Sequence, residues 1–265
     1  MREYKLNWRP DLSDLRDVPL RAVFRPPSKR PKTWNLVPGF SSVEDQLNEG
    51  SCTGQALAGV LEFLQIKAGV PFVDLSRQFA YYNARLLDGN TDYDAGSTIR
   101  TIVKAARRFG VCRESLWPYD VSTLSDKPLD KCYEEAEKHQ VTAYQRLRNL
   151  DEIRDCIAMG LPVIFGFTVY EHVMSDEVAK TGVVRMPNKD ESVLGGHAAV
   201  FAAYDDNREV LLWRNSWNKT WGMDGYGEIP YDYVRKKLAS DFWVVQATES
   251  DLYAAYKINS GEAVA

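Results

Sequence analysis

Apolar residues recur at helical spacing in the segment that begins at Cys52. One face of this segment carries Ala56, Val60, Phe63 and Leu64. Apolar residues spaced three and four positions apart lie on one side of a helix. The pattern therefore predicts a helix that starts at the cysteine and packs one side against the rest of the protein.

Two further helices are predicted where a serine precedes a helical pattern and a glycine follows it. Serine caps the start of a helix and glycine its end. These segments run from Ser76 to Gly89 and from Ser97 to Gly110. A polar helix is expected over residues 129–139, with His139 as a solvated surface residue.

From residue 141 the pattern changes to short runs rich in β-branched and aromatic residues. The runs at 141–147 and 161–170 enclose one helix, which Asn149 and Glu152 can start as a capping pair. Runs around 197–204, 209–217 and 226–229 predict antiparallel strands with a hairpin turn at 205–207. A short helix and a closing strand follow over 231–246. The order of elements predicts an α+β protein.

Composition and charge exclude several classes of partner. The 265 residues are 45% hydrophobic, and 33 basic against 37 acidic side chains give a net charge of −4. This balance gives no indication of binding to nucleic acid or to an anionic membrane. No apolar run approaches the roughly 18 residues that span a bilayer, and the N-terminus lacks the apolar core of a signal peptide. Residues 25–32 are basic and proline-rich, which indicates a solvated loop, with a basic recognition patch as the alternative.

The chain has four cysteines. Cys52 begins a helix, where free N–H groups favour an anion and lower a thiol pKa, so it is a candidate nucleophile. A buried, inert cysteine is the alternative. The remaining three are Cys112, Cys132 and Cys156. Cys156 is expected to pack inside a helix, and a Cys112–Cys132 bridge remains open. An odd number does not form a complete disulfide framework, so a reducing, cytoplasmic location is favoured over secretion.

Two later segments supply the partners that a nucleophilic cysteine needs. His197 follows two glycines and opens a β-prone run, and Asn215 follows a strand in a loop rich in Trp and Gly. A thiol, an imidazole and an amide in this order can form a thiolate–imidazolium pair with an orienting side chain.

These motifs together resemble the papain-like cysteine peptidases. The resemblance runs from about residue 15 to residue 245, and any single motif alone would be a weak signal. Its motifs are Gln46 with Gly50-Ser51-Cys52, Gly196-His197-Ala198, and Asn215-Ser216-Trp217 followed by Trp221-Gly222 and Gly225-Tyr226.

The resemblance implies a cysteine endopeptidase with a papain-like two-lobed fold. A helical left lobe and an antiparallel β-barrel-like right lobe would hold the active-site cleft between them. Cys52 would be the nucleophile, His197 its base, Asn215 the residue that orients the imidazole, and Gln46 an oxyanion donor. Trp217 would cover the His–Asn bond. The substrates would be peptides or proteins, with no cofactor and no metal, since no cluster of ligands has the spacing of a metal site.

The resemblance also suggests substrate-binding residues. Gly96 would offer its backbone to an extended peptide, as a short β-augmentation. The pocket for the side chain two residues before the scissile bond would be lined by Ser97, Thr98 and Gly195, with Gly196 beside His197. A carboxylate from the Asp241 region near the base of this pocket would favour a basic side chain.

Four regions follow from this interpretation. Residues 1–40 form an N-terminal strap, 41–140 a helical lobe with the nucleophile, 141–250 a β lobe with the histidine and asparagine, and 251–265 a C-terminal tail. The first dozen residues are expected either to lie in the cleft as an autoinhibitor, with Trp8 as apolar anchor, or to pack elsewhere on the body. The protein is expected to be a monomer.

The sequence departs from the commoner family pattern at several positions. Thr53-Gly54 follow the nucleophile in place of the usual continuation, Gly196 stands where some relatives carry a carboxylate, and Asn218 replaces a glycine. Two other functions stay open: a thioester-forming acyltransferase or peptide ligase, and a non-catalytic peptide-binding protein. His172 is a minor rival to His197, because it lacks the flanking glycines.

Overall fold

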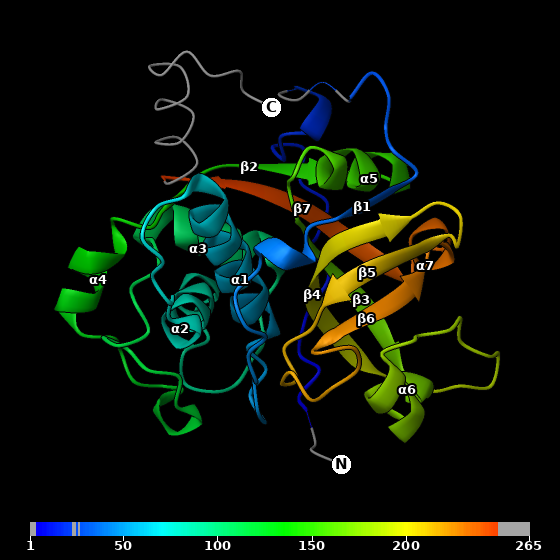
Figure 1. The fold of residues 1–265 in the computed structure, drawn as a ribbon. Helices are drawn as coiled ribbons and strands as arrows, with labels where there is room; N and C mark the ends of the chain where they lie inside the picture. Colours follow the sequence, from blue (N-terminus) through cyan, green and yellow to red (C-terminus); the bar gives the residue numbers. More distant parts are fainter. Residues whose placement is uncertain (1–3, 23–24, 26, 249–265) are drawn as a thin grey trace.

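The computed structural model describes residues 4–22, 25 and 27–248. Helices gather in one half of the molecule and a sheet forms the other (Figure 1). The helical half contains α1 (Cys52–Ala68), α2 (Arg77–Asp88), α3 (Ile99–Phe109) and α4 (Asp130–Ala136). The predicted α+β class is confirmed. The predicted tail, 251–265, lies outside the described residues.

The sheet half is antiparallel throughout, in the order β2-β7-β3-β4-β5-β6, with β1 pairing to β4. Three helices accompany it: α5 (Leu150–Ala158), α6 (Asp176–Thr181) and α7 (Asp232–Arg235). The strands are β1 (Thr33–Asn35), β2 (Val141–Leu147), β3 (Val163–Tyr170), β4 (Val193–Asp205), β5 (Val210–Arg214), β6 (Tyr226–Pro230) and β7 (Ala239–Ala247).

Capping residues set the helix ends. Ser76 accepts a hydrogen bond from the Phe79 N–H at the start of α2, and Gly89 ends that helix at φ 71°, where glycine is favoured. At α3 the cap is Thr98 and the prediction of Ser97 is wrong. The Ser97 hydroxyl is instead 2.6 Å from Thr53 Oγ1, inside the core, and so cannot cap the helix.

Helix α1 is buried from Cys52 to Gln65. It packs between the sheet strand β4 and the other helices of its half. Glycines on two sides permit this close packing. A Cβ at Gly54 would lie 2.9 Å from the Arg77 carbonyl oxygen, and one at Gly59 would lie 2.9 Å from Arg214 Nε. The helix that carries the nucleophile candidate is therefore fixed from both halves.

The predicted polar helix at 129–139 is shorter than expected, since α4 ends at Ala136. The expectation of a solvated His139 is wrong: its side chain is 12% exposed, with Nε2 3.7 Å from Glu135 Oε1. All four cysteines are buried free thiols, so Cys112 and Cys132 share a small core cluster without forming a bridge. Cys156 is fully buried within α5, as expected for a packing residue.

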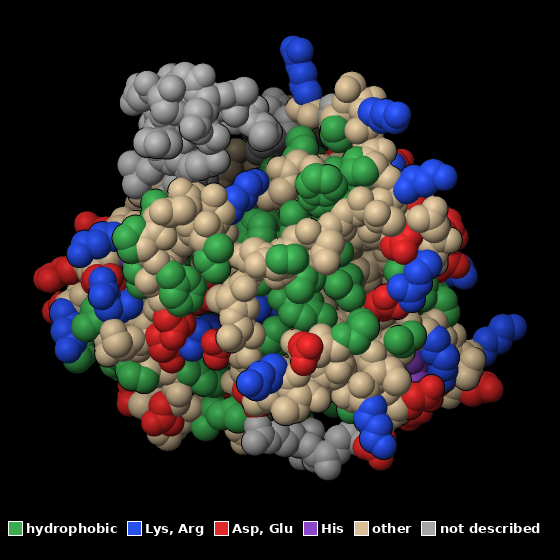
Figure 2. Space-filling model, in the orientation of Figure 1, with side chains coloured by type: hydrophobic (Ala, Val, Ile, Leu, Met, Phe, Trp, Pro, Cys, Tyr) green, Lys and Arg blue, Asp and Glu red, His purple; other side chains and the backbone are tan. Residues whose placement is uncertain are grey.

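The described surface is mixed in charge. On the face in Figure 2, acidic and basic side chains alternate around a band of apolar side chains. Within the described ranges, none of the helices combines the length and the apolar character needed to cross a bilayer.

Candidate active site

Three elements bring the predicted Cys, His and Asn to one edge of the sheet. Cys52 is the first residue of α1, His197 lies in β4, and Asn215 directly follows β5. Strands β4 and β5 pair with Val200 opposite Arg214. This register brings the histidine and the asparagine together, and His197 Nε2 lies 2.9 Å from Asn215 Oδ1.

This hydrogen bond determines which ring nitrogen is left for chemistry. The amide oxygen only accepts, so His197 Nε2 carries the proton. His197 Nδ1 is buried and has no hydrogen-bond partner in the described chain. The backbone N–H of Ala198, the residue after His197, donates a hydrogen bond to the Cys52 sulfur and so opposes the rise in its pKa. Nδ1 is therefore the ring atom available to exchange a proton with Cys52.

Trp217 covers the imidazole from one side. Its ring centroid lies 4.7 Å from that of His197, and its own exposure is only 2%. Trp221 packs edge-on against Trp217 at 5.5 Å between centroids. These rings keep water away from the His197–Asn215 bond, which strengthens it.

The Gln46 side chain is held by the neighbouring loops. Its Oε1 accepts a hydrogen bond from Ser216 Oγ at 2.7 Å. Its Nε2 donates to the Glu49 carbonyl at 2.9 Å and to the Lys5 carbonyl at 3.2 Å. One amide N–H of Gln46 thus donates to the Lys5 carbonyl oxygen. An oxyanion donor makes the same kind of hydrogen bond to the oxygen of a substrate.

Lys5 belongs to residues 4–9, here called the cleft segment, which run between the two halves of the molecule. In Figure 1 the dark blue stretch rises from the N-terminus between the helices and the sheet. Gly196 pairs with it on both sides: its N–H donates to the Leu6 carbonyl at 3.1 Å, and its carbonyl accepts from the Trp8 N–H at 3.1 Å. The Arg9 N–H donates to the Ser97 carbonyl at 3.3 Å.

Glycines make room for the cleft segment. A Cβ at Gly96, where φ is 65°, would lie 1.9 Å from the Asn7 carbonyl oxygen. At Gly196 it would lie 2.5 Å from the Trp8 carbonyl oxygen, and at Gly166 in β3 it would lie 2.0 Å from the Trp8 ring. Such distances exclude any side chain, so Trp8 fills a space that exists because Gly166 has none.

The other end of the cleft segment lies against the histidine side of the site. The Tyr4 ring stacks on Trp217 with 4.9 Å between centroids, and the Tyr4 hydroxyl donates to the Trp217 carbonyl at 3.1 Å. The segment therefore passes from Trp217, past Gln46, to Gly196 and Ser97.

Burial shifts both reactive groups towards their neutral forms. Desolvation raises the pKa of the Cys52 thiol to about 12, against the opposing effect of the Ala198 and Thr53 N–H groups. Desolvation also lowers the pKa of His197 to about 4, although the bond to Asn215 favours the charged ring. The helix N-terminus alone predicts a lower thiol pKa. In this structure burial outweighs that effect.

The predicted substrate-binding residues are only partly free to serve that role. The Gly96 N–H donates to the Tyr81 hydroxyl at 2.9 Å, whereas the Gly196 backbone pairs with the cleft segment. Thr98 uses its hydroxyl to cap α3. Gly195 faces the cleft segment, because a Cβ there would lie 2.6 Å from the Leu6 carbonyl oxygen.

Asp241 does not present a free carboxylate. It is buried, accepts a hydrogen bond from the Asp11 N–H at 2.6 Å and pairs with Arg146. The rival His172 pairs through Nδ1 with the Glu191 carboxylate, and so has a partner of its own.

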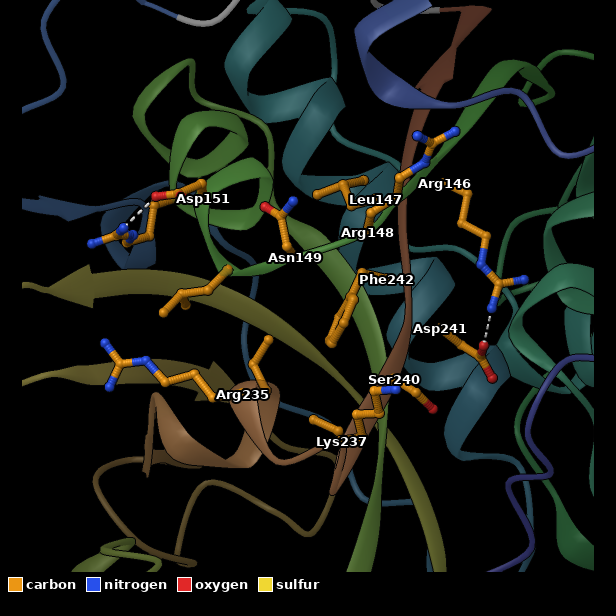
Figure 3. Close-up of a pocket in the computed structure, with 14 residues that line it drawn as sticks. Arg146, Leu147, Arg148, Asn149, Asp151, Arg235, Lys237, Ser240, Asp241 and Phe242 are labelled. Carbon is orange, nitrogen blue, oxygen red and sulfur yellow. Dashed lines mark hydrogen bonds and ion pairs between the residues drawn. The ribbon is translucent and has the colours of Figure 1, made fainter. Parts of the chain in front are cut away.

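A cavity of about 670 Å³ is lined by Asp241 and Arg146, but not by Cys52, His197, Asn215 or Gln46, and lies between β2, the start of α5, α7 and β7 (Figure 3). Leu147 and Phe242 give it an apolar floor, and Arg148 and Lys237 stand at its rim. Figure 3 shows Arg146 turned towards Asp241, with which it pairs. None of the described residues that line it is a cysteine or histidine, so the cavity lacks the reactive groups of the cleft.

Three residues of the site were not singled out from the sequence. Ser216 holds Gln46, Lys5 offers its carbonyl to Gln46, and Asp94 accepts hydrogen bonds from the loop before Cys52. Ser216 lies inside the Asn215-Ser216-Trp217 motif and Asp94 lies two positions before Gly96, and these positions are the only signal that the sequence offers for them. Lys5 lies in a segment without periodicity and gave none.

Comparison with known proteins points to one family. Residues 31–242 match the model of the papain family cysteine proteases. A peptidase C1-like protein of Acanthamoeba polyphaga mimivirus is 38% identical over 221 residues, which are 79% of this chain and 71% of the viral protein.

Solved structures agree. Xylellain, a cysteine protease from Xylella fastidiosa, superposes with a TM-score of 0.83 and 35% identity over 93% of this chain and 98% of its own. A procathepsin B from Trypanosoma congolense shares the fold at 17% identity, with a TM-score of 0.75 over 92% of this chain and 87% of its own.

Proposed function

The chain belongs to the papain family of cysteine proteases, and we propose that it hydrolyses internal peptide bonds through Cys52 and His197. The observation that carries this proposal is the bond between His197 Nε2 and Asn215 Oδ1, which leaves the buried Nδ1 without a hydrogen-bond partner among the described residues. A ring fixed in that tautomer acts as a base only through Nδ1.

The proposed reaction uses groups already in place. His197 Nδ1 takes the thiol proton, and the Cys52 sulfur attacks the peptide carbonyl carbon. The tetrahedral oxyanion receives hydrogen bonds from Gln46 Nε2 and the Cys52 N–H. His197 then gives its proton to the leaving amine, and water hydrolyses the thioester in a second addition and elimination. Each oxyanion donor is expected to contribute about 3–4 kcal/mol to transition-state stabilisation.

We further propose that the cleft segment inhibits the enzyme. The Lys5 carbonyl accepts from Gln46 Nε2, the donor intended for the oxyanion, and the Gly196 backbone is paired with Leu6 and Trp8. A substrate needs the same groups. The segment places its N-terminal end at Trp217 and its C-terminal end at Ser97. If the pocket at Ser97 takes the side chain two residues before the scissile bond, the segment runs opposite to a substrate, which explains how it could lie there uncut.

The shifted pKa values support this proposal. A neutral thiol is a poor nucleophile, and burial holds Cys52 and His197 neutral while the cleft segment is in place. Departure of the segment would return water to the cleft, lower the pKa of Cys52 and raise that of His197. Activation would then couple opening of the cleft to formation of the ion pair.

The peptidase proposal is tested by replacing the nucleophile. Cleavage of a denatured protein and of fluorogenic peptides is measured for the full chain and for a Trp8→Ala chain, in which the cleft segment loses its anchor. Adding Cys52→Ala to Trp8→Ala is expected to lower kcat/KM by about 10³-fold or more. The matched control is Cys156→Ala, another buried thiol, which should retain activity.

Two results would contradict the proposal. Hydrolysis that survives Cys52→Ala would exclude this residue as nucleophile. Acyl transfer to an added amine in preference to water would identify an acyltransferase or ligase instead.

A further inference from the structure

We propose that Asp94 is a positioning residue of this site, which holds the oxyanion-donor loop and the Gly96 turn in register. Asp94 lies in the loop between α2 and α3, and its side chain is 8% exposed. The inference rests on the proposed peptidase function and concerns how the Gln46 amide is kept in place.

The first link runs from Asp94 to Gln46 through one peptide group. Asp94 Oδ2 accepts from the Gly50 N–H at 3.0 Å, and Oδ1 lies 3.2 Å from the same nitrogen. The carbonyl of that same planar unit, Glu49 C=O, accepts from Gln46 Nε2 at 2.9 Å. A carboxylate on one side of the unit therefore fixes, and polarises, the acceptor that orients the Gln46 amide on the other side.

The second link runs from Asp94 to the substrate-binding turn. The Tyr81 hydroxyl, from α2, donates to Asp94 Oδ1 at 2.5 Å and accepts from the Gly96 N–H at 2.9 Å. The two carboxylate oxygens thus connect the loop before Cys52 to the turn that contacts the cleft segment. No other described side chain makes hydrogen bonds to both Gly50 and Tyr81.

The third link is to the cleft segment itself. Lys5 Nζ lies 2.9 Å from Asp94 Oδ2, while the Lys5 carbonyl accepts from Gln46 Nε2. One residue of the segment thus contacts both ends of the chain of hydrogen bonds that leads from Asp94 to Gln46.

The nearby Glu49 does not take this role. Its side chain is buried, and neither carboxyl oxygen has a hydrogen-bond partner in the described structure. Burial, followed by the charge of Asp94, raises the pKa of Glu49 to about 7. Asp94, by contrast, receives donors from Gly50, Tyr81 and Lys5.

The test separates binding from turnover in the Trp8→Ala chain. Asp94→Asn removes the charge at nearly constant shape and is expected to lower kcat about tenfold with a smaller change in KM, because the donor is needed most in the transition state. Asp94→Ala should lower kcat about 100-fold. Tyr81→Phe, which removes the acceptor of the Gly96 N–H, should act mainly by raising KM.

The matched control is Asp88→Asn. Asp88 also pairs with the N-terminal region, through Arg9 at 2.8 Å, but among the described residues it makes no hydrogen bond to the loop before Cys52. Asp88→Asn should leave kcat within about twofold of that of the Trp8→Ala chain, which is the parent of these variants. Circular dichroism and thermal melting establish folding for each variant, and Asp94→Asn carries the test if Asp94→Ala does not fold.

The outcomes distinguish the two proposals. If Trp8→Ala shows no hydrolysis that depends on Cys52, the peptidase function fails and the role of Asp94 fails with it. If the parent is active and both Asp94→Asn and Tyr81→Phe retain its kcat and KM within threefold, only the positioning role is overturned.

Discussion

Individual residues of the site were predictable where short motifs fix their neighbours. The motifs predict Cys52, His197, Asn215 and Gln46 as site residues. In the structure His197 is hydrogen-bonded to Asn215, and Ser216 is hydrogen-bonded to both Asn215 and Gln46. The pKa shifts of the reactive groups were not predictable, because they depend on burial in the folded structure. The pKa values of Cys52 and His197 move in the directions set by desolvation.

Gln46→Ala tests the proposed oxyanion donor. In the Trp8→Ala chain it should lower kcat/KM by about 10²–10³-fold, since one donor is lost in the transition state. Steady-state kinetics on a peptide substrate provide the measurement. Gln145→Ala, another buried glutamine on strand β2, is the matched control and should leave the kinetics unchanged. A Gln46→Ala enzyme with parental kcat/KM would remove this residue from the mechanism.

Single elements were largely predictable from periodicity and caps. Helix α1 begins at Cys52 and α2 lies between Ser76 and Gly89, as the pattern indicated. The error at α3 has a local cause. Ser97 and Thr98 are adjacent and both suit a cap, and only tertiary packing against Thr53 decides that Ser97 is used elsewhere.

Asn149→Ala tests the cap of α5. The Asn149 Oδ1 accepts from the Glu152 N–H at 3.0 Å, so its loss should lower the free energy of unfolding by about 1 kcal/mol. Urea denaturation followed by circular dichroism measures this change. Asn207→Ala, at an exposed turn position, should change it by less than about 0.5 kcal/mol. Equal effects of the two substitutions would contradict the capping role.

The whole molecule was predictable in class and family but not in the path of its N-terminus. The papain-like α+β fold is confirmed by the family match and by the superposition on xylellain. Residues 4–9 show no periodicity, and their partners Gln46, Gly96 and Gly196 are far away in the sequence. Such long-range pairing has no local signal, so the two alternatives for this segment could not be separated from the sequence.

The pH dependence of Cys52 alkylation tests the central claim, that a Cys52–His197 pair lies under a covering segment. With the thiol pKa raised to about 12, only a small fraction is thiolate at neutral pH. Labelling by iodoacetamide, located by peptide mass spectrometry, should therefore be slow in the wild type. Its rate should rise about tenfold per pH unit between pH 6 and 9.

Trp8→Ala should label at least tenfold faster at pH 6–7, with little pH dependence, and adding His197→Ala should abolish that gain. Tyr4→Ala, which loosens the other end of the segment, should act in the same direction. Trp34→Ala, at a partly exposed tryptophan on β1, is the matched control and should label like the wild type. Labelling of Trp8→Ala and Tyr4→Ala at the wild-type rate, or a fast rate that persists without His197, would contradict the account.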